Sequence, residues 1–198
     1  LPDIQSFKPS VLLVVPRVLE KVYNAASAKA GGGIKGKMFA WSAKQARTYA
    51  LAQERTFGPS LLKKARHGIA DALVLKKIRS ILGPNLRYIV SGGAPLATDL
   101  AQFYSGMGIT LLQGYGLSET TGPIAVQHVG KNPVGTVGLP LPGNFIKIAK
   151  DGEILVKGVS VMPGYYHLPD QTHQVIPDGE WFHTGDLGSI SKSGQLSI

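Results

Sequence analysis

The sequence predicts an α/β fold: part of an open, mostly parallel sheet with flanking helices, followed by part of a small antiparallel β-barrel subdomain. As far as about residue 130, short apolar runs alternate with segments of helical periodicity, the element order of an open α/β sheet. Beyond it, glycine and proline become frequent and short alternating segments replace the helical period. We therefore predict an α/β portion over residues 1–132 and a β-barrel-like portion over 133–198.

A buried strand and a helix are expected first. Residues 11–15 form a β-branched apolar run that ends at Pro16, as in a parallel strand covered on both faces. Pro16 suits the first turn of a helix. The apolar residues that follow recur at spacings of three and four, as in a helix; they are Val18, Leu19, Val22, Tyr23 and Ala26.

A helical insert over residues 31–84 is predicted next. It opens with three glycines, and Gly58 and Pro59 separate two helical stretches at 37–55 and 61–82. The second stretch carries a broad apolar stripe, made of Ile69, Leu73, Leu75, Ile78, Ile81 and Leu82.

Most of the positive charge of the chain lies on this insert. Between Lys29 and Arg87 there are 13 Lys and Arg residues but two acids, whereas the whole chain has a net charge of +9. Such a block suits a membrane surface, an anionic substrate or a solvated helical face. Its aromatic residues fall at helix-like intervals that favour packing over base stacking, so we expect no nucleic-acid partner. Peripheral contact with the cytoplasmic face of a membrane through these basic helices is the expectation that remains.

Cysteine is absent, which excludes a disulfide framework and thiolate metal sites. The five histidines lack the spacing of a zinc site. We expect no signal peptide, and no apolar run reaches membrane-spanning length, so a cytoplasmic location is expected.

Two glycine-rich turns follow predicted strands. A strand at 86–90 leads into the turn 91–95 and a helix at 97–104, and a strand at 109–112 leads into the turn 113–122. Because open α/β sheets bind ligands beyond the carboxyl ends of their strands, both turns are candidate binding segments.

The second turn carries three chemical groups suited to a nucleotide. The Tyr115 ring can stack on a base, the Ser118 hydroxyl can bond a phosphoryl oxygen, and the Glu119 carboxylate can hold Mg²⁺ beside phosphates. The alternative interpretation is a glycine-rich loop in which polar residues occur by chance.

A further candidate lies in the β-rich part, where strands are expected at 145–148, 153–157 and 187–190. Asp186 follows Thr-Gly at a predicted tight turn and can present both carboxylate oxygens to a diol such as ribose. Alternatively it caps its own turn. Nearby His183 is expected to be structural, because no nucleophile lies close to it in sequence.

Four segments resemble motifs of the adenylate-forming superfamily, which contains acyl-CoA synthetases, firefly luciferases and peptide-synthetase adenylation domains. Residues 115–119 resemble Y-G-x-[TS]-E, and residues 91–95 resemble the adenine-side turn. Residues 152–158 with 163–166 resemble G-E-[IL]-x-V-[RK]-G…G-Y-Y, and 181–186 resemble W-[FL]-x-T-G-D. Residues 15–23 and the basic helical insert are most similar to long-chain fatty acyl-CoA ligases.

The resemblance implies a role for each site residue. Tyr115 would stack on adenine, Ser118 would contact the α-phosphate, Glu119 would bind Mg²⁺, and Asp186 would hold the ribose hydroxyls. Ser118 stands where threonine is more usual but keeps the hydroxyl. Ser118 and Glu119 are the implied catalytic residues. The implied nucleotide-binding residues are Gly93, Ala94, Tyr115, Gly116, Ser118 and Asp186.

The activity implied is ATP-dependent ligation of a long-chain fatty acid to coenzyme A through an acyl-adenylate. Two alternatives are a ligase for an amino or aryl acid and, from another class, a basic module that binds membranes or nucleic acid. The phosphate-binding loop and the C-terminal domain with its catalytic lysine, both typical of the superfamily, are absent from the sequence. We therefore expect a middle fragment that is inactive by itself and prone to self-association through cut sheet edges.

Overall fold

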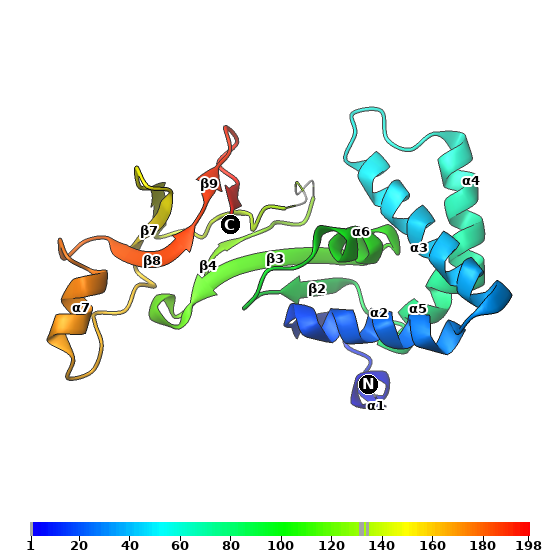
Figure 1. Cartoon of the computed structure of the whole chain (residues 1–198), viewed down its shortest axis with the longest axis horizontal. Coiled ribbons are helices and arrows are strands. Elements are labelled where there is room, and N and C mark those ends of the chain that lie inside the picture. Colours follow the sequence, from blue (N-terminus) through cyan, green and yellow to red (C-terminus); the bar gives the residue numbers. More distant parts are fainter. Residues whose placement is uncertain (1, 131–132, 134) are drawn as a thin grey trace. The chain divides into compact units, whose positions relative to one another are not determined.

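The computed structural model describes residues 2–130, 133 and 135–198. It contains two compact units, Leu1–Leu112 and Gln113–Ile198 (Figure 1). The subdomain boundary expected between residues 132 and 133 adjoins residues outside the described ones and stays a prediction.

The first unit is an α/β arrangement with parallel strands. Strand β1 pairs in parallel with β2, from Val11 opposite Tyr88 to Val14 opposite Ser91. The Thr110 N–H donates to the Arg87 carbonyl, so β3 begins beside β2. The elements are α1 (Pro2–Phe7), β1 (Val11–Val14), α2 (Pro16–Ala30), α3 (Gly33–Gln53), α4 (Leu61–Ala70), the π-helical turn η1 (Asp71–Leu75), α5 (Lys76–Leu82), β2 (Tyr88–Ser91), α6 (Thr98–Gly106) and the start of β3 (Thr110–Leu117).

Helix α3 packs against both α4 and α6, as Figure 1 shows. The contact with α6 depends on Gly106, where a Cβ atom would stand 2.8 Å from the Ala46 Cα. Any larger residue would therefore push α6 away from α3. Glycine at 106 allows the insert to pack closely against the helix that follows β2.

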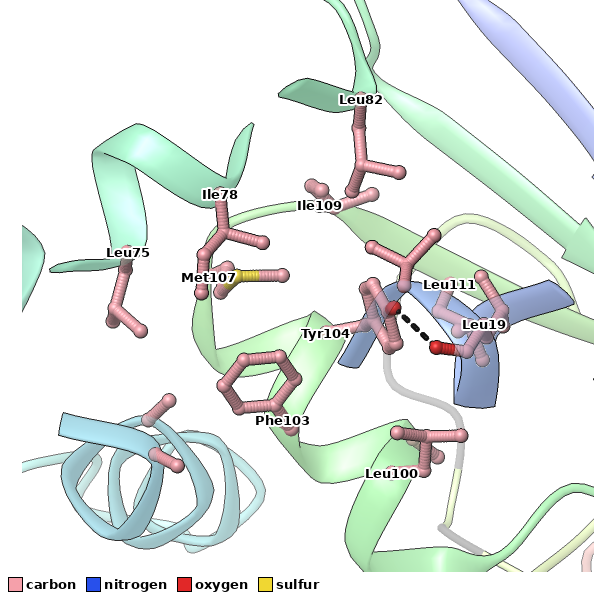
Figure 2. Packing of buried hydrophobic residues seen from close by; sticks show 14 of the residues in the cluster. Leu19, Leu75, Ile78, Leu82, Leu100, Phe103, Tyr104, Met107, Ile109 and Leu111 are labelled. Atoms are coloured by element: carbon pink, nitrogen blue, oxygen red, sulfur yellow. Dashed lines mark hydrogen bonds between the residues drawn. The ribbon is translucent and has the colours of Figure 1, made fainter. Parts of the chain in front are cut away.

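The core of this unit lies between the helices and the strands (Figure 2). Tyr104 is fully buried, and its hydroxyl donates to the Leu19 carbonyl at 2.8 Å, which satisfies the only polar group of the side chain. Burial raises the pKa of Tyr104, so the phenol stays protonated and keeps donating. The same cluster contains Leu19, Leu75, Ile78, Leu82, Leu100, Phe103, Met107, Ile109 and Leu111.

The predicted helix at 61–82 forms, but with one turn of π-helix at Asp71–Leu75. A π-turn adds a residue per turn and rotates the apolar face. The predicted stripe is therefore wrong at Ile69 and Leu73, which are 55% and 40% exposed, and right at Leu75 and Ile78, which are buried.

The π-turn carries a two-point ion pair between Asp71 and Arg79. Arg79 also donates to the Met107 carbonyl at 2.7 Å, so the pair joins the insert to the end of α6. The hydrogen bonds from Arg79 hold the pKa of Asp71 below its ordinary value.

Described strands of the second unit pair antiparallel, as predicted for residues 133–198. Strand β3 pairs with β4 and β4 with β5, while β6, β7 and β8 form a second sheet and β9 pairs with β10. Beyond β3, the elements are η2 (Ser118–Thr120), β4 (Gly122–Val126), β5 (Leu139–Pro140), β6 (Asn144–Ile148), β7 (Glu153–Gly158), α7 (Pro169–Val175), β8 (Phe182–Leu187), β9 (Ser189–Ile190) and β10 (Leu196–Ser197). No helix among the described residues is long and apolar enough to cross a membrane.

The strand predicted at 109–112 is longer than the sequence indicated. It continues through Tyr115 to Leu117, so the prediction of a turn over 113–122 is wrong for its first half. The reason is pairing: Gly114 lies opposite Val126 and Leu117 opposite Gly122, which gives the glycine-rich segment a strand partner.

Candidate active site

Tyr115 is placed by the pairing of β3 with β4. It lies opposite Ala125, whereas the next residue, Gly116, lies opposite Pro123, so β4 bulges at this point. A Cβ atom at Gly116 would stand 2.7 Å from the Pro123 Cα. Glycine at 116 therefore allows the close approach that fixes the backbone beside Tyr115.

The short η2 turn carries Ser118 and Glu119 directly after β3. It is held by buried Thr120, whose hydroxyl accepts the Leu117 N–H at 2.8 Å and donates to the Gly122 carbonyl at 2.8 Å. Ser118 is exposed and Glu119 is half-buried. The turn thus presents a hydroxyl and a carboxylate on a backbone that is fixed from inside.

Tyr115 and Asp186, 71 residues apart in the chain, are joined directly. The Tyr115 hydroxyl donates to Oδ2 of Asp186 at 2.7 Å. Burial raises the pKa of Tyr115, and the bond to the Asp186 carboxylate raises it further, so the phenol stays protonated. A carboxylate has about four acceptor positions, so Asp186 keeps acceptor capacity for a ligand hydroxyl.

Asp186 does not sit in a tight turn, as the sequence suggested, but in a bulge of strand β8. Leu155 of β7 lies opposite His183, and Glu153 lies opposite Leu187, so β8 spans the same stretch with two more residues. Gly185 has a φ of 74°, which suits glycine.

Glu119 is held by residues 162–165, most of which belong to the motif at 163–166, for which the sequence predicted no role. The Tyr165 hydroxyl donates to Oε1 of Glu119 at 2.9 Å, and the Met162 N–H donates to the Glu119 carbonyl at 2.8 Å. The bond to the Glu119 carboxylate raises the pKa of Tyr165, so Tyr165 remains a donor. The Tyr165 N–H is itself bonded to the Thr172 hydroxyl of α7 at 2.9 Å.

Glu153 is a second residue whose part in the site the sequence did not indicate. Its Oε2 lies 2.7 Å from Nδ1 of His183, and its Oε1 accepts the Gly185 N–H at 2.8 Å. His183 therefore has a carboxylate partner, and its expected structural role stays a prediction. Glu153 does belong to the motif at 152–158, and this motif is the sequence feature that could have indicated a role for it.

The predicted site residues fall into two groups. Tyr115, Gly116, Ser118, Glu119 and Asp186 belong to the second unit, where the first four follow one another along β3 and η2. The first unit contains the other two, Gly93 and Ala94, both exposed between β2 and α6, Gly93 with a φ of 77°. The individual ligand roles stay predictions.

Glu119 is the predicted metal ligand of the site. Among the described residues, no group of three or more His, Cys, Asp or Glu could hold a metal ion. A single carboxylate such as Glu119 fits Mg²⁺, which takes one or two protein carboxylates and fills its remaining positions with phosphate oxygens and water.

Comparison with known proteins gives the family context of this geometry. Long-chain-fatty-acid–CoA ligase FadD15 of Mycobacterium bovis is 48% identical over 198 residues, which are 100% of this chain and 33% of that protein. Long chain acyl-CoA synthetase 3 of Arabidopsis thaliana is 34% identical and covers 100% of this chain and 31% of that protein. The chain thus spans about a third of the length of these relatives.

Solved structures of acyl-CoA-forming enzymes are similar to the chain. The o-succinylbenzoate CoA synthetase of Bacillus subtilis, in complex with its acyl-adenylate intermediate, matches with a TM-score of 0.55 and 29% identity over 63% of this chain and 28% of that chain. The anthranilate CoA ligase AuaEII matches with a TM-score of 0.59 and 18% identity over 98% of this chain and 30% of that chain. The second likeness concerns the fold alone and confirms the predicted fold class.

The AMP-binding enzyme family matches residues 1–166. This match contains the strand and turn with Tyr115 and Glu119, as well as Glu153 and Tyr165, which complete the arrangement around them. Three of the four motifs lie within the matched residues, and the fourth, at 181–186, lies in the part covered by the relatives described above. The resemblance is confirmed, and the chain belongs to the family of AMP-binding enzymes.

Proposed function

We propose that the chain is the middle part of an ATP-dependent long-chain fatty acid–CoA ligase. The observation that carries the proposal is the joining of Tyr115 to Asp186 in the same unit that presents Ser118 and Glu119. The proposal assigns Tyr115 to the base, Asp186 to the ribose, Ser118 to a phosphate and Glu119 to the metal ion. The 48% identity to a protein named as a long-chain-fatty-acid–CoA ligase supports the choice of acyl substrate.

Under this proposal, each residue acts by binding and orientation. Asp186 accepts hydrogen bonds from the ribose hydroxyls while the Tyr115 hydroxyl fixes its carboxylate. The Ser118 hydroxyl donates to an α-phosphate oxygen. Glu119, braced by Tyr165, supplies a carboxylate to Mg²⁺, which neutralises phosphate charge when bound.

The proposed reaction has two steps. The fatty carboxylate attacks the α-phosphorus of ATP and releases pyrophosphate, and the coenzyme A thiol then displaces AMP to form the thioester. Positioning and charge neutralisation supply the catalysis, so no covalent bond to the protein is needed.

The test uses the full-length protein that contains this chain. Fatty-acid-dependent formation of AMP is measured with C12–C20 acids, with and without coenzyme A, and with o-succinylbenzoate and anthranilate as aryl acids. We expect AMP formation with the fatty acids and thioester formation when coenzyme A is present. Turnover confined to aryl acids would support an aryl-acid ligase instead, and absence of turnover on every C12–C20 acid would contradict the proposal.

We also propose that the full-length protein is cytoplasmic and contacts a membrane peripherally through the insert. The loop between α3 and α4 exposes Phe57 almost completely, and Leu61 and Leu62 at the start of α4 are 84% and 60% exposed. Lys63 and Lys64 follow directly. Apolar side chains beside lysines suit an anionic lipid surface.

A further inference from the structure

The carboxylate of Glu153 is fully engaged with the segment that carries Asp186. Its side chain is 18% exposed, and each of its oxygens contacts a different part of β8. Oε1 accepts the Gly185 N–H at 2.8 Å, and Oε2 lies 2.7 Å from Nδ1 of His183. Glu153 therefore contacts β8 immediately before Asp186 and again three residues before it.

The bulge creates the need for such a residue. Between the two paired positions, β7 contributes only Ile154 whereas β8 contributes Thr184, Gly185 and Asp186. The N–H groups of Gly185 and Asp186 are bonded to side chains rather than to a partner strand. Without such partners they would be unpaired, and unpaired backbone groups are costly in free energy.

The side chains of this region supply the missing partners. The Asp186 N–H is bonded to the Thr184 hydroxyl at 3.1 Å, which in turn donates to the Ile154 carbonyl at 2.8 Å. The Gly185 N–H is bonded to Glu153. A charged acceptor makes a stronger hydrogen bond than a neutral one, so Glu153 is the stronger of these two supports.

We propose that Glu153 is a positioning residue for the nucleotide: it holds the β8 bulge in the conformation that aims Asp186 at Tyr115 and at the ribose. This inference rests on the proposed ribose-binding role of Asp186. In this proposal Glu153 acts without contacting the nucleotide itself. Its effect passes through the Gly185 peptide, which is the backbone unit next to Asp186.

A purely structural role would make Glu153 a brace between β7 and β8 with no special bearing on ribose. The two roles differ in one readout. If Glu153 acts through Asp186, its removal weakens binding of nucleotides that carry ribose hydroxyls and leaves binding of 2′,3′-dideoxy-ATP nearly unchanged. A general loosening of the sheet weakens both nucleotides alike.

The experiment measures KM for ATP and for 2′,3′-dideoxy-ATP, kcat and the melting temperature in the full-length protein. The variants are Glu153→Ala, Glu153→Gln and Asp186→Ala. Glu180→Ala is the matched control, because Glu180 also pairs with a β7 residue, Lys157, but at the surface. If Glu153→Ala does not fold, Glu153→Thr takes its place, since threonine suits a strand and its side chain is two bonds shorter.

We expect Glu153→Ala to raise KM for ATP by about tenfold, as for loss of a charged hydrogen bond, and KM for the dideoxy nucleotide by less than about twofold. Glu153→Gln keeps an acceptor for the Gly185 N–H, so its KM for ATP should lie close to that of the parent protein. Equal increases for both nucleotides, or no increase for ATP, would overturn the proposal. If Asp186→Ala left the ratio of KM for dideoxy-ATP to KM for ATP unchanged, the proposed ribose-binding role of Asp186 would be wrong. If Asp186→Ala lowered this ratio to about one while Glu153→Ala left it unchanged, Asp186 would keep its proposed role and only the inference about Glu153 would be wrong.

Discussion

Glu119 combines a functional position with an unusual degree of support. Its carboxylate is bonded to Tyr165 and its carbonyl to the Met162 N–H, so both ends of the residue are fixed. A residue held in this way can present its remaining acceptor capacity to a cation without reorganising.

Replacement of Glu119 by glutamine should keep the fold and lower the rate of adenylation. Glutamine retains the shape and can still accept the Tyr165 hydroxyl, but it removes the negative charge from the proposed metal ligand. We expect kcat of the full-length protein to fall on the order of 100-fold with little change in melting temperature. Near-normal kcat at saturating Mg²⁺ would remove Glu119 from the metal role.

The bond between Tyr115 and Asp186 should contribute both to stability and to binding. In Tyr115→Phe, the Asp186 carboxylate loses a buried donor, and we expect a loss of about 1–3 kcal/mol in the free energy of unfolding, together with a higher KM for ATP. Chemical denaturation and initial-rate measurements on the full-length protein test this.

Tyr166→Phe is the control for that variant, since Tyr166 is 87% exposed. It should change neither quantity. An unchanged KM for ATP in Tyr115→Phe would mean that the hydroxyl orients nothing that the nucleotide contacts.

At the scale of elements, the pairing of β3 with β4 depends on a missing side chain. Gly116→Ala forces a Cβ atom into the backbone of Gly122 and Pro123, so the two strands must separate. We expect a loss of at least about 2 kcal/mol in the free energy of unfolding, comparable to overpacking of a core. The matched control is Gly68→Ala in α4, where the space is open and alanine should stabilise the helix by up to about 1 kcal/mol. Equal melting temperatures for the two variants would contradict the close approach of the strands.

The π-turn of the insert should give stability that depends on pH. The pKa of Asp71 is lowered in the folded state by Arg79, so the ion pair contributes fully above the ordinary Asp pKa of 3.8 and is lost progressively as the pH falls from there through the lowered pKa of the folded state. In Asp71→Asn we expect a loss of about 1 kcal/mol at pH 7, a modest value because both side chains are partly exposed, and a smaller further loss on acidification than in the parent. Denaturant unfolding of both proteins at pH 7 and pH 3 tests this, and parallel pH profiles would contradict it.

Elements with a clear period were predictable from the sequence, and elements decided by a partner were not. The helix at α2 and the strands at β6 and β7 follow from apolar spacing alone. Strand β4 and the second half of β3 were missed, because glycine-rich residues 114–126 show no alternation and become strands only through each other. The π-turn was missed for a similar reason: it depends on the contact of Arg79 with Asp71 and Met107.

The site shows the same division. The groups that carry the chemistry, Tyr115, Glu119 and Asp186, stand out in the sequence by their type and their motifs. Their partners do not, because Tyr165 is 46 residues from Glu119 and Glu153 is 32 residues from Gly185. No local pattern connects such positions, so these supports require the folded structure.

At the scale of the whole molecule, the basic insert should give the full-length protein a salt-dependent affinity for anionic membranes. We expect co-sedimentation with vesicles of phosphatidylserine and phosphatidylcholine, weakened by salt. Binding should be at least about 30-fold weaker for Lys63→Glu with Lys64→Glu, since each lysine near such a surface contributes about 1 kcal/mol. Lys150→Glu with Lys192→Glu, in the second unit, is the control with the same change in net charge. Equal weakening by both pairs would mean that net charge, rather than the insert, governs membrane binding.

The bond between Gly185 and Glu153 also makes one amide a natural probe. Gly185 is exposed, yet its N–H is held by a carboxylate, and it stands one peptide bond from Asp186. Its hydrogen should exchange with solvent more slowly than the surface position alone suggests, and its nitrogen resonance should be displaced by the neighbouring negative charge. In nitrogen-15-labelled protein, this single glycine signal would report the state of the bulge, and therefore of the proposed nucleotide site, without an attached dye or spin label.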